Sequence, residues 1–391
     1  MRALTWQGVN KLEVENVDDP TILDDQDVVL KVRATAACGS DLHLLGGYIP
    51  AMREGDVIGH EFLGEVVEAG RGVTRLRVGD RVVVASVISC GRCWHCRQGE
   101  FSLCDNGNPH PAMTEAVWGH SPAGIFGYSQ MMGGFAGSHA EYVRVPFADQ
   151  GCFVVPEGLD DDSAVYASDA APTGWMGADL ADIHPGEVVA VWGAGGVGQM
   201  AARAALLLGA GAVIVIDRFD YRLRQVEAVI GAVPLNYEEF DDLHDVLLDM
   251  TGGRGPDRCI EAVGMEAHGD NSLQYAYDKA KQALRLESER GVTLRQAIRS
   301  CRKGGTVSVL GVFGGFLDKF PFGAAMNKGL TIRGAQQHGQ RYIPMLLDRM
   351  AAGEIPTAHL TTHPMSLEDA PRGYEMFKEK DDGCVRAVFH P

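Results

Sequence analysis

The sequence predicts an α/β protein in which a doubly wound domain with a parallel sheet is inserted into a β-rich domain. The length of 391 residues is typical of two or three domains. The first part of the chain contains short β-branched runs. From about residue 188, an apolar strand, a glycine-rich turn, a helix and a second strand follow one another. That order is typical of a βαβ unit with parallel strands.

Short strands are expected in the first part of the chain, where Gly and Asp turns bound the runs Val28–Val32 and Arg81–Val84. The βαβ unit begins with a buried strand at Val188–Trp192. An Ala/Leu-rich helix at Met200–Leu208 and a second strand at Ala212–Ile216 complete it. We therefore expect the type of sheet to change between these two parts of the chain.

Later segments set the expected domain limits. Thr306–Leu310 predicts a further strand of the parallel sheet, and mixed short elements return after Ile332. We expect a catalytic domain over residues 1–167, the inserted parallel-sheet domain over 168–334, and a return to the catalytic domain over 335–391.

Charge and composition exclude several classes of partner. The net charge of −17, from 35 basic and 52 acidic residues, disfavours nucleic acids and anionic membranes. We find no apolar run typical of a signal peptide or a membrane span, so a soluble, cytoplasmic protein with a small-molecule substrate is expected. In that compartment the nine cysteines would bind metal or stay reduced.

Four cysteines lie close together with the spacing C-x2-C-x2-C-x7-C: Cys90, Cys93, Cys96 and Cys104. Four thiolates on so short a loop can close a tetrahedral shell around Zn²⁺ and leave no position for substrate. The spacing predicts a structural zinc site. An iron–sulfur cluster is the main alternative, because four cysteines can bind that group too.

A second possible metal site combines Cys38 with His60. A thiolate and an imidazole suit Zn²⁺, and a catalytic zinc has three protein ligands and one open position. Taken alone, these two residues are a weak signal, because a buried cysteine or a hydrogen-bonded histidine is common.

A glycine-rich turn follows the strand at Val188–Trp192 and opens a helix; it contains Gly193, Gly195, Gly196, Val197 and Gly198. In this context G-x-G-x-x-G predicts a dinucleotide site, with the pyrophosphate at the helix N-terminus. Asp217 ends the next strand, 24 residues after Gly193, where an acid binds the ribose 2′-hydroxyl. Its charge favours NAD over NADP, although Arg218 beside it could soften that preference. Asp217 could instead be only a turn residue.

Three motifs agree in order with one known family. Gly59–Gly70 reads G-H-E-x2-G-x5-G, Cys38 lies upstream, and the four-cysteine lobe follows. Over essentially its whole length the chain resembles the zinc-containing medium-chain alcohol dehydrogenases. The resemblance implies a GroES-like β-rich catalytic domain and a Rossmann domain. It also implies two zinc ions per chain, NAD, and a homodimer or homotetramer.

The same resemblance assigns the residues of the catalytic metal site. Cys38 and His60 would bind the catalytic zinc, and Glu61 would lie beside the metal and be able to approach it. Asp169, which precedes a Pro-Thr-Gly turn, would be the third ligand. The alternative for Asp169 is a helix-capping carboxylate.

The resemblance also implies a route for the substrate proton. Ser40 and His43 would form a relay that includes the cofactor ribose, and Thr173 would contact the edge of the nicotinamide ring. Alternatively, Ser40 caps a turn and His43 is a buried structural imidazole.

Two long segments, Gly107–Gly137 and Glu266–Ser300, resemble insertions of the glutathione-independent formaldehyde dehydrogenase and aldehyde dismutase branch, which enclose the cofactor there. Surface elaboration or a subunit interface is the alternative. The implied activity is NAD-linked oxidation of a small alcohol or a hydrated, formaldehyde-like aldehyde. An aldehyde dismutase that retains NAD, or a non-catalytic member, remains an alternative. The retained ligands disfavour the non-catalytic member and a zinc-free quinone reductase.

Overall fold

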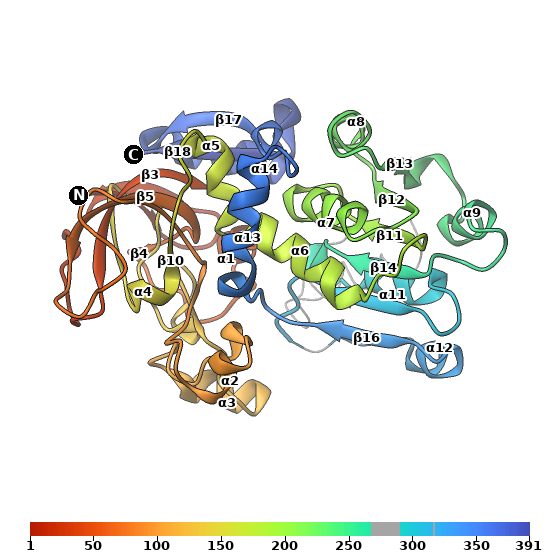
Figure 1. The fold of residues 1–391 in the computed structure, drawn as a ribbon, viewed down its shortest axis with the longest axis horizontal. Helices are drawn as coiled ribbons and strands as arrows, with labels where there is room; N and C mark the ends of the chain where they lie inside the picture. Colours follow the sequence, from red (N-terminus) through yellow and green to blue (C-terminus); the bar gives the residue numbers. More distant parts are fainter. Residues whose placement is uncertain (267–289, 316) are drawn as a thin grey trace. The chain divides into compact units, whose positions relative to one another are not determined.

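The computed structural model describes residues 1–266, 290–315 and 317–391. The chain divides into two compact units, Met1–Pro172 with Gln337–Pro391, and Thr173–Gln336. Figure 1 shows the elements of both units, coloured along the sequence. Much of the expected Glu266–Ser300 insertion, residues 267–289, lies outside the described residues.

The first unit is built around a mainly antiparallel sheet with the strand order β10-β6-β5-β3-β18-β17, and β9 also pairs with β3. Strand β3 is central because its nine residues pair with three other strands. Its side chains are mostly buried. The strands are β3 (Val28–Ala36), β5 (Glu61–Ala69), β6 (Arg81–Val84), β9 (Tyr142–Val145), β10 (Cys152–Val154), β17 (Thr361–Ser366) and β18 (Arg386–His390).

Two smaller sheets and short helices complete this unit. The small sheets contain β1 (Arg2–Trp6), β2 (Leu12–Asn16) and β4 (Asp56–Val57), and β7 (Val87–Ile88) with β8 (Gly124–Ile125). The α-helices are α1 (Asp41–Leu45), α2 (Trp94–Arg97), α3 (Pro111–Trp118), α4 (Ala148–Gly151), α5 (Asp161–Ala164), α13 (Gly339–Ala351) and α14 (Ala370–Glu379). The 3-10 helices are η1 (Phe101–Leu103), η2 (Gln130–Met132), η3 (Val165–Ala167), η7 (Ala358–Leu360), η8 (Leu367–Asp369) and η9 (Asp381–Gly383).

The second unit contains a six-stranded parallel sheet with the order β13-β12-β11-β14-β15-β16. Counted along the chain this is 3-2-1-4-5-6, the doubly wound order of a Rossmann domain. The strands are β11 (Val188–Trp192), β12 (Ala212–Asp217), β13 (Val233–Asn236), β14 (Arg258–Glu261), β15 (Thr306–Val309) and β16 (Thr331–Gly334).

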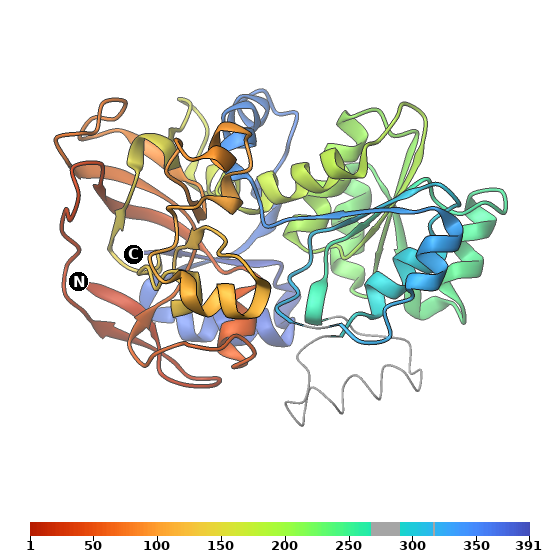
Figure 2. The ribbon, with the colours of Figure 1, turned by 90° about the horizontal axis from the view of Figure 1, so that it is seen from below.

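Helices cover both faces of this parallel sheet (Figure 2). Helix α6 (Ala170–Ala181) crosses the division between the units. The others are α7 (Gly196–Leu207), α8 (Asp220–Gln225), the π-helix η4 (Val226–Ile230), α9 (Leu243–Met250), α11 (Val292–Ser300), α12 (Phe322–Lys328) and the 3-10 helices η5 (Tyr237–Glu239) and η6 (Gly264–Glu266).

The predicted fold class is therefore confirmed, with one difference in a helix boundary. The helix after β11 begins at Gly196, inside the glycine-rich motif, four residues before the expected start at Met200. The Ala/Leu-rich pattern begins only at Met200, whereas the first turn contains Gly196 and Gly198, and glycine is a weak helix former. Among the described residues, no helix has both the length and the apolar character needed to cross a membrane.

Candidate metal and nucleotide sites

The four-cysteine lobe brings its thiols together around one point. The four Sγ atoms of Cys90, Cys93, Cys96 and Cys104 all lie within 4.8 Å of one another. The Sγ atoms of Cys93 and Cys104 are 3.9 Å apart. Tetrahedral zinc with Zn–S bonds of about 2.3 Å requires S···S separations of about 3.8 Å. The geometry fits a single zinc ion and is too compact for an iron–sulfur cluster, whose cysteines bind different irons.

Backbone amides of the lobe point at these sulfurs and stabilise their thiolate form. Cys90 N donates to Cys104 Sγ at 3.2 Å, and Cys96 N donates to Cys93 Sγ at 3.5 Å. A hydrogen bond from Cys96 lowers the pKa of Cys104 to about 5, together with amide donors. A thiolate is the form that binds zinc, so the donor set suits the metal.

A second group of possible ligands assembles at one end of the central sheet. Cys38 follows β3 and His60 precedes β5, and these strands are antiparallel neighbours in which Ala36 pairs with Glu61. Asp169 lies between η3 and α6. All three side chains are buried, and their ligand atoms lie within 4.8 Å of one another. Strand pairing thus joins residues that are far apart in sequence.

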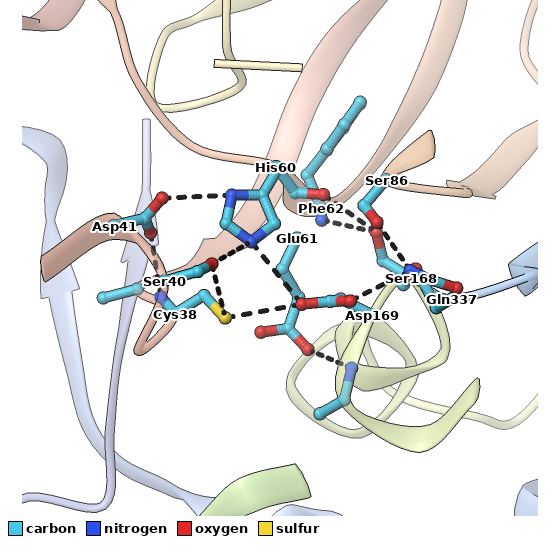
Figure 3. Close-up of polar contacts among 12 residues, drawn as sticks. Cys38, Ser40, Asp41, His60, Glu61, Phe62, Ser86, Ser168, Asp169 and Gln337 are labelled. Carbon is cyan, nitrogen blue, oxygen red and sulfur yellow. Dashed lines mark hydrogen bonds and ion pairs between the residues drawn. The ribbon is translucent and has the colours of Figure 1, made fainter. Parts of the chain in front are cut away.

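The side chains of this second group point toward one another (Figure 3). Asp169 Oδ2 lies 3.4 Å from Cys38 Sγ and 3.5 Å from His60 Nε2. Tetrahedral zinc with the usual bond lengths would separate such ligand atoms by about 3.3–3.6 Å. Three protein ligands leave a fourth position open, which is the arrangement of a catalytic zinc site.

Asp41 orients His60 from behind the metal position. Its Oδ1 lies 3.0 Å from His60 Nδ1, and its Oδ2 accepts hydrogen bonds from Cys38 N and Tyr374 Oη. Burial raises the pKa of Asp41, but the charge and hydrogen bond of His60 outweigh it and hold the value at about 2. A carboxylate behind a histidine ligand fixes the tautomer that leaves the opposite nitrogen free for metal.

Gln337 holds the other oxygen of Asp169. Its Nε2 lies 2.9 Å from Asp169 Oδ1 and 3.0 Å from the carbonyl oxygen of Ser168. One carboxylate oxygen therefore faces Cys38 and His60 while the other is anchored (Figure 3). This arrangement favours Asp169 as a ligand over the helix-capping alternative.

Glu61 is buried beside this group and is held by two contacts. Its Oε1 accepts from Ala170 N at 2.8 Å, and its Oε2 lies 3.5 Å from Arg386, whose guanidinium also donates to the carbonyl of Ala37. Burial raises the pKa of Glu61 to about 7, although Arg386 acts in the opposite direction. Glu61 thus lies close to the ligands, and the charges of Asp169 and His60 both act on its pKa.

The expected relay residues differ in their surroundings. Ser40 is half-buried, and its Oγ lies 3.4 Å from Cys38 Sγ and 3.2 Å from His60 Nε2, at the edge of the ligand group. His43 lies in α1 and is buried. Ser40 can therefore reach a group held at the open metal position.

The Gly107–Gly137 segment contributes to the core and to this site. Residues such as Ala123, Ile125 and Met132 belong to a buried cluster, whereas α3 is mostly exposed. Tyr128 packs edge-on against the His60 ring with a centroid distance of 6.2 Å. Surface elaboration therefore describes α3 and the exposed residues on either side of it, whereas residues 122–133 are packed inside the unit.

The glycine-rich turn of the second unit has the shape that a pyrophosphate needs. Gly193 has φ +100°, which favours glycine. A Cβ on Gly198 would lie 1.8 Å from the carbonyl oxygen of Gly193, whereas a Cβ on Gly195 would meet nothing closer than 3.9 Å. The turn therefore packs tightly on one side and leaves open space beside Gly195, at the N-terminus of α7. Gly196 and Val197 form the first turn of this helix.

Asp217 ends β12 and is tied to the glycine-rich turn. Its Oδ2 accepts from Ala194 N at 2.7 Å, and its Oδ1 accepts from the backbone amides of Arg218 and Phe219. A carboxylate has about four acceptor sites, so capacity remains for a ribose hydroxyl. The Arg218 guanidinium lies 4.8 Å from the Phe219 ring centroid and 3.7 Å from Glu238.

Two family models match parts of this chain. Residues 24–157 match the alcohol dehydrogenase GroES-like domain, and residues 196–284 match the zinc-binding dehydrogenase family. A zinc-type alcohol dehydrogenase-like protein of Bacillus subtilis is 37% identical over 393 residues, which covers 100% of both chains. The chain belongs to the zinc-containing medium-chain alcohol dehydrogenase family. It is therefore an oxidoreductase of the zinc-dependent alcohol dehydrogenase type.

Two further proteins are similar to this chain over nearly its whole length. A glutathione-independent formaldehyde dehydrogenase of Pseudomonas aeruginosa is 33% identical over 403 residues, covering 96% of this chain and 94% of the relative. The solved alcohol dehydrogenase TADH of Thermus sp. ATN1 superimposes with a TM-score of 0.83 at 32% identity, covering 100% of this chain and 99% of the other.

Sequence reasoning missed several residues around the metal positions of this zinc alcohol dehydrogenase. Asp41 lies three residues after Cys38, a spacing that could have indicated it. Three residues of the last part of the chain also reach the site: Gln337, which lies just before α13, Tyr374 in α14 and Arg386 in β18. No local pattern indicates them, because strand and helix packing alone brings them there.

Proposed function

We propose that this zinc alcohol dehydrogenase transfers a hydride between NAD and a small alcohol or a hydrated, formaldehyde-like aldehyde. The observation that carries the proposal is the buried Cys38–His60–Asp169 group, whose atoms are spaced as zinc ligands and leave one position open. Bound there, zinc supplies a Lewis acid that lowers the pKa of a substrate hydroxyl. The second zinc would be held by the four-cysteine lobe.

The chain's own residues would then bind the substrate and move its proton. Ser40 Oγ lies within hydrogen-bonding reach of the metal-ligand atoms, so its hydroxyl is placed to accept the substrate proton. His43 would receive that proton at the end of the relay. Asp41 and Gln337 keep two ligands in their orientations, so that the open position is defined before substrate binds.

NAD would bind at the glycine-rich turn. The open space beside Gly195 admits the pyrophosphate to the N-terminus of α7, where amide groups and the helix dipole favour an anion. Asp217 would bind the adenosine ribose and disfavour a 2′-phosphate. Thr173 would contact the nicotinamide ring. Likeness to the formaldehyde dehydrogenases supports a small aldehyde hydrate as substrate.

The test is a substrate screen with the purified protein. Small alcohols and aldehydes would be supplied with NAD⁺, with and without thiol, while NADH absorbance and both carbon products are followed. Cys38→Ser should abolish NADH formation. Cys152→Ser, which alters a buried cysteine of β10 outside both metal groups, should retain activity. Activity that survives Cys38→Ser would contradict the proposal. Equal amounts of acid and alcohol formed without added NAD⁺ would indicate the aldehyde dismutase instead.

A further inference from the structure

Behind His60, a chain of buried polar side chains continues beyond Asp41. Tyr374 Oη donates to Asp41 Oδ2 at 2.8 Å, and His139 Nε2 lies 2.8 Å from Tyr374 Oη. His139 Nδ1 lies 2.8 Å from Thr35 Oγ1, which lies 2.8 Å from Ser138 Oγ. All five side chains are at most 1% exposed, and they come from different strands, loops and helices. Such a fully buried chain must be satisfied internally.

The direction of each hydrogen bond follows from the number of protons available. Tyr374 has one hydroxyl proton and gives it to Asp41, so its oxygen accepts from His139 Nε2–H. Burial lowers the pKa of His139 to about 4, so the ring is neutral near pH 7 and its Nδ1 carries no proton. Thr35 Oγ1 then donates to Nδ1 at 2.8 Å, with the carbonyl oxygen of Glu61 as a second, longer acceptor at 3.3 Å, and it accepts from Ser138. The hydrogen bonds from His139 Nε2 and Tyr374 Oη therefore both point toward Asp41.

The packing around His139 holds this series of hydrogen-bonded side chains in place. Gly59, the residue before His60, has φ +101°, and a Cβ there would lie 2.5 Å from His139 Nδ1. The His139 ring also packs edge-on against Phe389, with centroids 5.1 Å apart. The glycine of G-H-E therefore makes room for His139 directly beside the ligand His60.

We propose that Tyr374, held by His139, is a positioning residue for the catalytic metal. Its hydroxyl fixes the Oδ2 atom of Asp41, which leaves Oδ1 facing His60 Nδ1. His60 then keeps its proton on Nδ1 and presents the Nε2 lone pair to the metal. This inference rests on the proposed zinc site at Cys38, His60 and Asp169.

A purely structural hydroxyl would behave differently. Tyr166 provides the comparison, because it is also fully buried in the first unit and its hydroxyl bonds to Thr361 Oγ1 at 2.8 Å. Removing the Tyr166 hydroxyl leaves one buried hydrogen bond unmade and removing the Tyr374 hydroxyl leaves two, so both variants should lose stability. Only the Tyr374 hydroxyl is linked to a metal ligand, so only its removal should change metal binding.

The experiment measures metal release from the holoenzyme. Wild type, Tyr374→Phe and Tyr166→Phe would be mixed with a chromogenic chelator and the release of each zinc ion timed. Cobalt exchanged into the catalytic site would report the ligand field by its visible spectrum. We expect Tyr374→Phe to release one of its two metals about tenfold faster than wild type and to alter the cobalt spectrum. Tyr166→Phe should match wild type in both measurements.

A second variant tests the proton directions. Thr35→Val removes the hydroxyl that donates to His139 Nδ1. The His139 ring can then carry its proton on Nδ1 and accept at Nε2. The Tyr374 hydroxyl would donate to Nε2 instead of to Asp41. The same metal should then be released faster. Wild-type release and spectra in both Tyr374→Phe and Thr35→Val would overturn the inference, and Thr35→Val decides it alone if Tyr374→Phe does not fold. A wild-type protein that holds only the four-cysteine metal would instead contradict the proposed function.

Discussion

Asp41→Asn is the substitution that most directly tests how His60 is prepared for metal. The carboxylate meets three donors: Cys38 N and Tyr374 Oη at Oδ2, and His60 Nδ1 at Oδ1. An asparagine can keep its oxygen where two donors converge, but its NH2 group then faces His60. His60 Nδ1 must become an acceptor, which moves the ring proton to Nε2 and blocks that atom as a ligand.

The expected loss of metal affinity follows from the removal of one charged hydrogen-bond partner of the ligand His60. Such substitutions typically weaken metal binding 10–100-fold, which corresponds to about 1.4–2.8 kcal/mol. The four-cysteine lobe is unaffected because no Asp41 contact reaches it among the described residues. We therefore expect Asp41→Asn to retain one zinc ion firmly and to bind the second weakly, with turnover restored in part by excess zinc.

The assay is metal analysis after dialysis, followed by titration with zinc while activity is recorded. Asp27→Asn is the matched control, because Asp27 is also buried in the first unit and accepts from two backbone amides and Arg144. The control should lose stability but keep both metals. Two tightly bound zinc ions in Asp41→Asn would refute the tautomer argument.

Three further predictions concern the other site residues. Asp169→Asn and Cys38→Ser should each lower kcat/KM by more than about 100-fold, because both remove a ligand from the open site. The circular dichroism spectrum of each variant should match that of wild type. Full activity in Asp169→Asn would show that Asp169 is not a ligand. Cys96→Ser should lower the free energy of unfolding by more than about 3 kcal/mol, because a closed metal site contributes to folding. Denaturant titration measures this change. An unchanged free energy of unfolding would argue against a structural metal. Asp217→Ala should reduce the ratio of kcat/KM with NAD to kcat/KM with NADP. It should also weaken the binding of both cofactors, because Asp217 anchors Ala194 in the glycine-rich turn. A wild-type protein that prefers NADP would contradict the assignment.

Parts of the fold could be predicted from local sequence patterns. The strand at Val188–Trp192 and the strand at Ala212–Ile216 were predicted because an uninterrupted apolar run is typical of a strand that is covered on both faces. The four-cysteine lobe was equally readable, since its ligands lie within 15 residues of sequence. In both cases the relevant interactions are local, so the order of the residues carries the information.

The Cys38–His60 pair could be proposed only by resemblance to a family. Neither residue carries a specific signal alone, and they meet because β3 and β5 pair in an antiparallel register that puts Ala36 opposite Glu61. The partners that come from the last part of the chain could not be predicted from the sequence. Gln337 reaches Asp169 across 168 positions of sequence, and Tyr374 reaches Asp41 across 333.

The sequence by itself therefore determined the two kinds of sheet, the four-cysteine lobe and the glycine-rich turn. Each is specified by periodicity or spacing over a few neighbouring residues. Only the tertiary structure decided which oxygen of Asp169 faces the ligands, and which hydrogen bonds direct the proton of His60. Those features depend on Gln337, just before α13, and on Tyr374 of α14, which reach the site from the last part of the chain. Contacts between segments so far apart in sequence have no local sequence pattern.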